Sequence, residues 1–187
     1  PPPPPPPPTN TLYRSSAASD VYKRQPLALL RACHDKIIAH CEMIEQIVGA
    51  LQGEDEDFDT RAAARQVMNY FSRSARQHHQ DEEQDLFPLL IRQSLKLADL
   101  INSLKQEHRK LDELWQTMEP ELRRMPEPSD PDAFIAAASA FCSLNREHVV
   151  RENSDFLPVA RSSLSSQQIR DIGRAMAQRR GAPYPVS

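Results

Sequence analysis

The residues of this chain best suited to chemistry lie in the stretch HHQDEEQDLFP, at residues 78–88. A histidine and a glutamate four residues apart share one face of a helix, so they can direct two metal-binding groups at the same place. Two such pairs overlap here, His78 with Glu82 and His79 with Glu83. Imidazole nitrogens and carboxylate oxygens both bind transition-metal cations. The stretch therefore predicts a helix that carries part of a metal site.

A second stretch repeats the pattern, because residues 148–158 read HVVRENSDFLP. Counting back from the proline that ends each stretch, His148 and His78 both lie ten residues before it. Glu152 and Glu82 both lie six residues before it. This shared register favours the first of the two overlapping pairs. The neighbouring histidine and glutamate are then either supporting partners of the site or surface residues.

Two further histidines interrupt stripes of apolar residues at helical spacing. Between residues 26 and 52, apolar side chains recur every three or four positions, and His34 fills the only gap. Between residues 94 and 123, His108 fills the only gap in a similar stripe. Both histidines are therefore expected on buried helix faces, where an unpaired polar group is costly.

The four histidines lie at matching distances along the bundle axis if the helices form an up-down bundle with short loops. At a rise of about 1.5 Å per residue, His34 and His78 each lie roughly 27 Å from the first loop, and His78 and His108 roughly 20 Å from the second. By the same rise, His108 and His148 lie roughly 21 to 24 Å from the third loop. If these were ordinary buried histidines with no shared role, there would be no reason for all four to lie at the same position along the bundle axis. The candidate metal ligands are His34, His78, Glu82, His108, His148 and Glu152.

The mixture of ligand types narrows the choice of metal. Imidazole suits zinc, copper, iron and nickel, whereas carboxylates favour harder cations, so this set fits iron or manganese well and zinc less specifically. Six side chains are too many for one tetrahedral zinc and too few to saturate two octahedral ions. We therefore expect two ions bridged by the two glutamates, with open positions for solvent or a small ligand. His34 and His78 would bind one ion, and His108 and His148 the other.

The rest of the sequence is typical of an all-α protein. It has four glycines, 6% aromatic residues and long periodic segments among its 187 residues. Short connections predict an up-down-up-down four-helix bundle followed by a short C-terminal helix. The predicted helices cover residues 26–52, 60–91, 94–123, 132–160 and 165–180.

Local features refine these helices. Leu89 and Val159 fall on the apolar stripes of the second and fourth helices. Pro88 predicts a kink or an early end of the second helix, because proline cannot donate a backbone hydrogen bond. Ser129 or Asp130 is placed to cap the fourth helix.

Residues 1–25 differ in kind from the rest of the chain. They begin with eight consecutive prolines and end with SSAASDVYKRQ, which one reading frame of a common sequencing adapter would encode. We interpret this segment as a sequencing or assembly scar, with a Pro-rich disordered leader as the alternative. The domain is therefore assigned to residues 26–187, which are enough to bury a single core.

Charge and cysteine usage exclude several classes of function. The formal charge is −3, and because residues 1–25 hold three basic residues and one acidic residue, the domain alone carries −5. Neither nucleic acid nor an anionic membrane surface is therefore an expected partner.

No apolar run approaches the roughly 18 residues of a membrane span. Cys33, Cys41 and Cys142 are odd in number and lack a C-x-x-C spacing, which predicts reduced thiols in a cytoplasmic protein.

The motifs together resemble those of one known family. HDKI at residue 34, HHQDEEQDLFP at 78, EH at 107 and HVVRE at 148 are similar to the motifs of the hemerythrin family, specifically the bacterial HHE cation-binding domains. The resemblance covers nearly all of residues 26–187. It implies a non-haem di-iron centre, with a bridging oxo or hydroxo group, held by the six candidate ligands.

The sequence departs from the animal oxygen carriers of this family in two places. Their third helix supplies two histidines four residues apart, whereas His108 has Leu104 before it and Asp112 after it at that spacing. Their last helix uses a longer spacing to an aspartate than the one between His148 and Glu152. Both departures bear on the coordination number, and therefore on reversible oxygen carriage. A ferritin-like site instead predicts Glu-x-x-His pairs, of which the sequence has none.

Three functions are compatible with the sequence. The first is a di-iron protein that binds oxygen or a related small molecule for sensing, storage or transfer. The second is a di-iron redox enzyme or a protein that repairs iron–sulfur clusters, although no residue is clearly placed as a general base. The third is redox sensing with Cys33, which precedes His34, as the reporting thiol.

Overall fold

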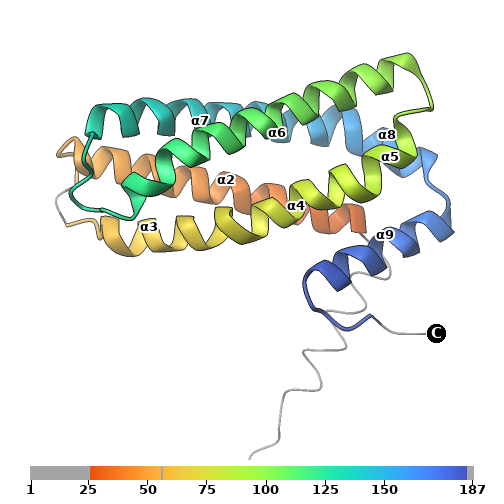
Figure 1. The fold of residues 1–187 in the computed structure, drawn as a ribbon, viewed down its shortest axis with the longest axis horizontal. Coiled ribbons are helices and arrows are strands. Elements are labelled where there is room, and N and C mark those ends of the chain that lie inside the picture. Colours follow the sequence, from red (N-terminus) through yellow and green to blue (C-terminus); the bar gives the residue numbers. More distant parts are fainter. Residues whose placement is uncertain (1–25, 56, 185–187) are drawn as a thin grey trace, which may run out of the picture.

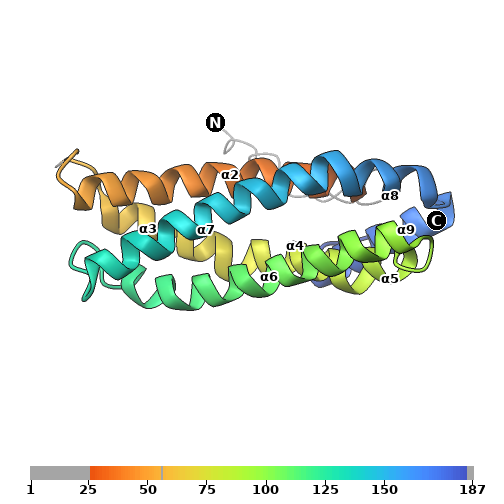
Figure 2. The same ribbon diagram turned by 90° about the horizontal axis from the view of Figure 1, so that it is seen from above.

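The computed structural model describes residues 26–55 and 57–184, so our interpretation of residues 1–25 concerns a segment outside the described residues. The described residues form four long helical rods, at residues 26–51, 60–90, 95–122 and 131–163, which run alternately up and down (Figure 1, Figure 2). A shorter helix at residues 166–179 lies beside one end. The predicted all-α bundle is confirmed. The elements are α2 (Pro26–Leu51), α3 (Thr60–Asn69), η1 (Tyr70–Ala75), α4 (Arg76–Gln80), η2 (Asp81–Leu86), α5 (Phe87–Leu90), α6 (Leu95–Leu122), α7 (Pro131–Arg151), η3 (Glu152–Phe156), α8 (Leu157–Ser163) and α9 (Ser166–Arg179).

Polar side chains cap the helices that come after the loops. Ser94 and Asp130 each accept a hydrogen bond from the backbone N–H three residues further on. Ser165 forms a reciprocal capping box with Gln168 at the start of α9. These caps satisfy backbone N–H groups that have no partner within the helix. Of the two capping residues predicted for the fourth rod, Asp130 rather than Ser129 therefore fixes its start.

The second and fourth rods pass through π-helical turns just before their prolines. η2 ends two residues before Pro88, and η3 ends two residues before Pro158. Proline removes a backbone donor, and its ring crowds the carbonyl four residues earlier. The wider π turn accommodates both effects without ending the rod. The π turn and the continuing helix α5 therefore replace the kink or early end predicted at Pro88.

These turns rotate the later residues of each rod away from the α-helical stripe. Leu89 and Val159, which the stripes place on the apolar side, are 39% and 38% exposed. Phe87 and Leu90 are buried on the second rod instead. One extra residue in a helical turn moves later side chains by about 100° around the axis. The prediction that Leu89 and Val159 belong to the core was therefore wrong.

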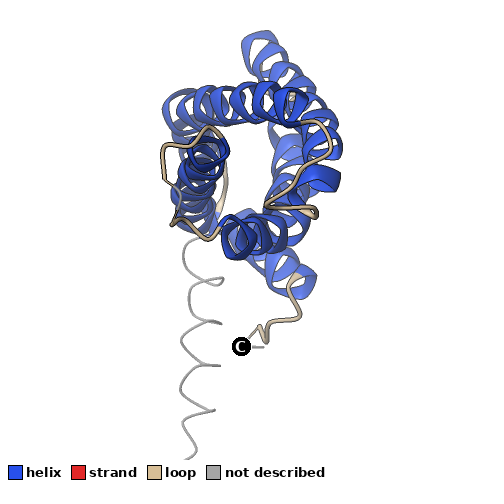
Figure 3. Ribbon diagram, turned by 90° about the vertical axis from the view of Figure 1, so that its left-hand side faces the viewer, coloured by secondary structure: helices blue, strands red, loops and turns tan. Residues whose placement is uncertain are grey.

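The apolar core is divided into two clusters with a polar level between them. In α6, Leu104 belongs to one cluster and Leu111 to the other, and His108 lies between them. His34 divides α2 in the same way. Seen end-on, the four rods surround this common core (Figure 3). Within the described residues, no helix is both long and apolar enough to cross a membrane.

Candidate metal centre

The six predicted ligands meet in the interior, at the polar level between the two apolar clusters. None of them is more than 2% exposed. Polar groups this deeply buried need charged or coordinating partners. All four rods contribute: His34 from α2, His78 from α4, Glu82 from η2, His108 from α6, His148 from α7 and Glu152 from η3.

These residues form two groups of four that share two members. Both groups contain Glu82 and Glu152, and the first adds the histidines of α2 and α4, while the second adds those of α6 and α7. Within each group, one ligand atom from every residue lies within 4.8 Å of the others. The division into pairs is the one expected for two cations that share both carboxylates. Metal binding by these side chains itself stays a prediction.

Each carboxylate directs one oxygen toward each pair of histidines. Oε2 of Glu152 lies 2.9 Å from Nε2 of His34, and Oε1 lies 3.2 Å from Nε2 of His148. The two oxygens of Glu82 lie 3.6 and 3.5 Å from the remaining two histidines, one in each pair. The carboxylates are therefore placed to bridge two cations.

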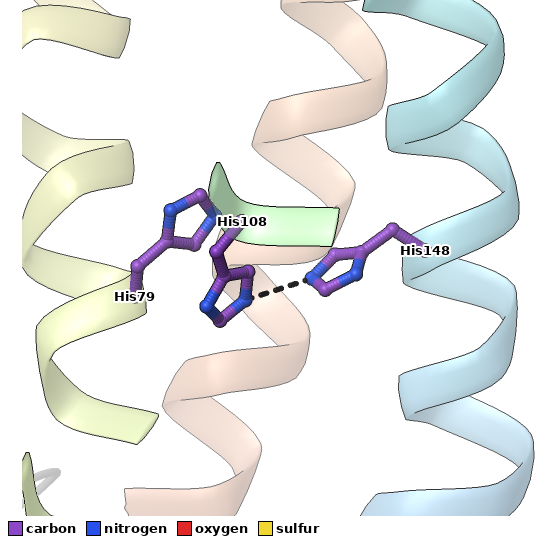
Figure 4. A group of neighbouring side chains, drawn as sticks. All are labelled: His79, His108 and His148. Carbon is purple, nitrogen blue, oxygen red and sulfur yellow. Dashed lines mark hydrogen bonds between the residues drawn. The ribbon is translucent and has the colours of Figure 1, made fainter. Parts of the chain in front are cut away.

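The histidines of α6 and α7 turn the same ring atom toward the interior. Nδ1 of His108 donates a hydrogen bond to Glu83 at 2.7 Å, and Nδ1 of His148 donates one to Glu107 at 2.8 Å. In a neutral imidazole, donation from Nδ1 leaves a lone pair at Nε2. The two Nε2 atoms lie only 3.1 Å apart (Figure 4). Two facing lone pairs repel each other unless a proton or a metal cation binds there.

Several buried polar atoms at the centre lie close to one another but make no hydrogen bond of acceptable geometry within the described residues. They are both oxygens of Glu82 and of Glu152, Nε2 of His34 and both nitrogens of His78. Nδ1 of His34 is occupied by a 2.9 Å hydrogen bond with Oδ1 of Asn153. A buried polar atom left without a partner costs about 1–3 kcal/mol. Cations would satisfy the inward-facing atoms together, so the residues fit a metal centre.

The charges at the centre shift the pKa values of its groups in different directions. Burial raises the pKa of Glu82 well above its usual range, and the Glu152 carboxylate raises it further. Burial alone would lower the pKa of His148, but Glu152 and Glu107 outweigh it and raise this pKa to about 9. Burial lowers the pKa of His78 to about 4. Without metal, protons on Glu82 and His148 therefore offset the negative charge that cations would otherwise neutralise.

Residues 25–160 match the family model of the hemerythrin HHE cation-binding domain. The chain belongs to this family. An uncharacterized protein of Haemophilus influenzae is 26% identical to it over 156 residues, which are 83% of this chain and 90% of that protein. The family binds metal cations, in agreement with the unsatisfied donor atoms of the centre. Helix α9 lies beyond the matched residues.

The HHE domain holds its candidate ligands with supporting residues to which the sequence analysis gave no role. Asn153 and Glu107 accept hydrogen bonds from His34 and His148. Arg151 in turn pairs with Glu107. Such partners fix the orientation of a ligating ring and raise its basicity. Each supporting residue is next to a predicted ligand in the sequence, and this adjacency is the signal that could have found it.

A buried cluster of ion pairs joins α9 to the turn η2 that carries Glu82. Asp81 is fully buried, and Arg179 and Arg180 both pair with its carboxylate. Arg179 also lies 2.9 Å from Asp85. The sequence pattern could not reveal these contacts, because Arg179 and Asp81 are 98 residues apart in the chain.

The second of the overlapping pairs, His79 and Glu83, divides between two roles. Glu83 supports His108 through the hydrogen bond to its Nδ1 and is 40% exposed, so it faces outward. His79 is half-buried, and its ring stacks on that of His108 with centroids 3.9 Å apart (Figure 4). Its ligand atom also lies within 4.8 Å of those of His108 and His148. His79 therefore adjoins the half of the centre that these two histidines form.

Proposed function

We propose that this HHE domain holds two iron ions and binds oxygen or a related small molecule at an open coordination position, for sensing, storage or transfer. The observation that carries the proposal is the sharing of Glu82 and Glu152 by two separate pairs of histidines. Two bridging carboxylates would hold the ions close together. The unsatisfied atoms of both carboxylates support this role.

The donor set supports iron over other metals. Four imidazoles and two carboxylates mix nitrogen and oxygen ligands, a combination that suits non-haem iron, with manganese and zinc as weaker fits. Six side chains leave positions free on two ions of higher coordination number. Those positions are where solvent or a small ligand would bind. The membership of the hemerythrin family agrees with this choice.

The surroundings of the centre favour binding over catalysis. Two carboxylates that contact predicted ligands, Glu83 and Glu107, already accept hydrogen bonds from His108 and His148. Neither is therefore free to act as a general base. We also place the protein in the cytoplasm, a proposal supported by the three free thiols at Cys33, Cys41 and Cys142.

The test is elemental analysis of protein purified without a metal-binding tag, followed by absorption spectra of the reduced protein before and after oxygen is added. We expect about two irons per chain, as the two donor groups require, and an absorption change that reverses when oxygen is removed. Irreversible oxidation, with turnover when an electron donor is supplied, would instead support redox or repair chemistry. Protein without bound metal would contradict the proposal.

A further inference from the structure

A small cavity of about 20 Å³ adjoins one half of the metal centre, between the second, third and fourth rods. Its outer end is lined by the exposed residues Arg76 and Asp112. Its inner end is lined by the half-buried His79 and the buried Asn145. Apolar side chains, most of them aromatic and among them Trp115, line the rest. The cavity therefore leads from the surface toward the half of the centre formed by His108 and His148.

The polar groups at the inner end have unused hydrogen-bonding capacity. Asn145 is 2% exposed, and its amide nitrogen donates to the backbone oxygen of Phe141 at 2.9 Å. No other hydrogen bond of Asn145 occurs within the described residues, so its amide oxygen is left over. The ring contacts of His79 are with other imidazoles, and no hydrogen bond of His79 occurs in the part of the chain that the structure describes. Two polar groups thus line a cavity that is otherwise mainly apolar.

The third rod leaves room for this cavity. Asp112 lies one turn after His108 and lines the cavity, so no second histidine from that turn reaches the centre. The half of the centre with His108 and His148 therefore has two histidines from its own rods and an approach from the cavity side. His79, whose ring stacks on His108, stands between that approach and the centre.

We propose that this cavity is the route by which an uncharged diatomic ligand reaches the metal at His108 and His148, and that His79 positions the ligand through a hydrogen bond. A cavity of about 20 Å³ exceeds the roughly 10–15 Å³ that one water needs, so it admits a ligand of two atoms and little more. Aromatic walls favour an uncharged molecule. Arg76 and Asp112 at the outer end carry opposite charges, so together they favour neither an anionic nor a cationic ligand. This inference rests on the proposed function.

Ala75→Val is designed to block the route. Ala75 is 5% exposed and lines the cavity, so two added methyl groups occupy the space. The matched control is Ala138→Val, because Ala138 is 1% exposed but lines a separate hollow between α2 and α7. Stopped-flow absorption then measures nitric oxide binding to the reduced, iron-loaded proteins. We expect Ala75→Val to slow association about tenfold, equivalent to about 1.4 kcal/mol in the barrier, with unchanged iron content, and Ala138→Val to leave the rate near that of the parent protein.

His79→Phe and His79→Gln test the hydrogen bond. Phenylalanine keeps the stacking on His108 but cannot donate, so nitric oxide should dissociate about tenfold faster, as loss of one hydrogen bond predicts. Glutamine keeps an N–H donor and should restore much of the slow dissociation. Both variants should retain two irons. Loss of one iron from His79→Phe would make His79 a ligand and overturn its positioning role.

A measurement without iron separates this inference from the proposed function. Crystals of the metal-free protein pressurised with xenon should show a xenon atom beside Ala75, and none there in Ala75→Val. Nitric oxide binding at equal rates in the parent and Ala75→Val would overturn the route while leaving the proposed function intact. Iron-loaded protein that binds no nitric oxide or oxygen, although xenon enters the cavity, would overturn the proposed function and this ligand with it.

Discussion

At the scale of single residues, Glu82 is expected to matter for metal binding but little for the stability of the metal-free fold. Its two oxygens face one histidine of each pair, and both are buried without a hydrogen-bond partner. Glu82→Gln should therefore release most of the bound metal, while the metal-free variant unfolds at about the same temperature, because burial already favours the uncharged, protonated form of Glu82 and the amide is uncharged too. Elemental analysis and thermal unfolding measure the two effects.

The matched control for this change is Glu83→Gln. The Glu83 carboxylate is 40% exposed and accepts a hydrogen bond from His108, and a glutamine oxygen can still accept that bond. With excess metal, the content of Glu83→Gln should therefore stay near two ions, the number that two donor groups imply, although its affinity should fall by about 10- to 100-fold because His108 loses a charged partner. Equal metal loss from both variants would contradict the register that assigns Glu82 to the centre.

Glu107 shows how a residue outside the ligand set tunes it. Its carboxylate accepts the Nδ1 hydrogen bond of His148 and pairs with Arg151. Glu107→Gln should weaken metal binding by about 10- to 100-fold, because the imidazole loses a charged partner that raises its basicity. Competition with a chelator measures the affinity. Glu113→Gln, which breaks only an exposed ion pair with Lys110, should bind metal like the parent protein.

The sequence was sufficient to find the six residues that meet at the centre but not the residues that support them. Each of the four histidines interrupts an apolar stripe, and a polar residue inside such a stripe stands out by its residue type. Asn153 and Asp81 instead lie beside the stripes, where polar residues are ordinary on solvent-facing positions. Their burial and partners depend on how the rods pack. Adjacency to a predicted ligand makes them candidates, and the three-dimensional structure is needed to show what they contact.

At the scale of elements, two arginines, at the last residue of α9 and the residue after it, join this helix to η2. Removing both side chains with Arg179→Met and Arg180→Met would leave the fully buried Asp81 without its two cationic partners. We expect a loss of about 3 kcal/mol in the free energy of unfolding, the cost of an unpaired buried charge. Urea unfolding measures it. Adding Asp81→Asn should recover most of the loss, and Arg174→Met, in an exposed pair with Asp171, should change little.

The elements themselves were predictable where the sequence pattern is local. Apolar stripes place the rods to within a few residues of their observed ends, and Asp130, one of the two caps predicted for the fourth rod, does cap α7. The π turns were missed because one extra residue per turn changes no residue type and shows only in the burial of residues further along the rod. The exposure of Leu89 and Val159 is the evidence for this rotation of the later residues. Predicting it requires knowing that Pro88 and Pro158 are accommodated inside continuous rods.

At the scale of the whole molecule, the buried residues His78 and His148 should make the stability of the metal-free fold depend on pH in opposite directions. The pKa of His78 falls to about 4 in the fold, so the unfolded chain binds a proton first and stability is lost as pH drops from 6.5 toward 4. The pKa of His148 rises to about 9, so its contribution is complete below 6.5 and is lost as pH rises through 9. We call these two losses the acidic and the alkaline limb of the pH profile. Each amounts to about 3 kcal/mol in the free energy of unfolding.

Urea unfolding of the metal-free protein at several pH values measures both limbs. His78→Gln cannot take up that proton, so its stability should vary less than that of the parent between pH 4 and 6.5, whereas its alkaline limb should remain. His148→Gln should lose the alkaline limb and keep the acidic one. Identical pH profiles for all three proteins would show that these two histidines do not control the stability of the metal-free fold.

Metal binding should change the shape of this pH profile, because cations and protons compete for the same atoms. A metal ligand must be a neutral imidazole or an ionised carboxylate, so the loaded protein can carry no proton at Nε2 of His148. The loss of stability between pH 6.5 and 9 should therefore disappear when metal is bound. Below pH 6 the opposite holds, since protons displace the metal and the loaded protein should lose stability more steeply than the metal-free one. Unfolding curves with and without iron across this range measure both changes, and an alkaline limb that persists in the loaded protein would place the metal away from His148.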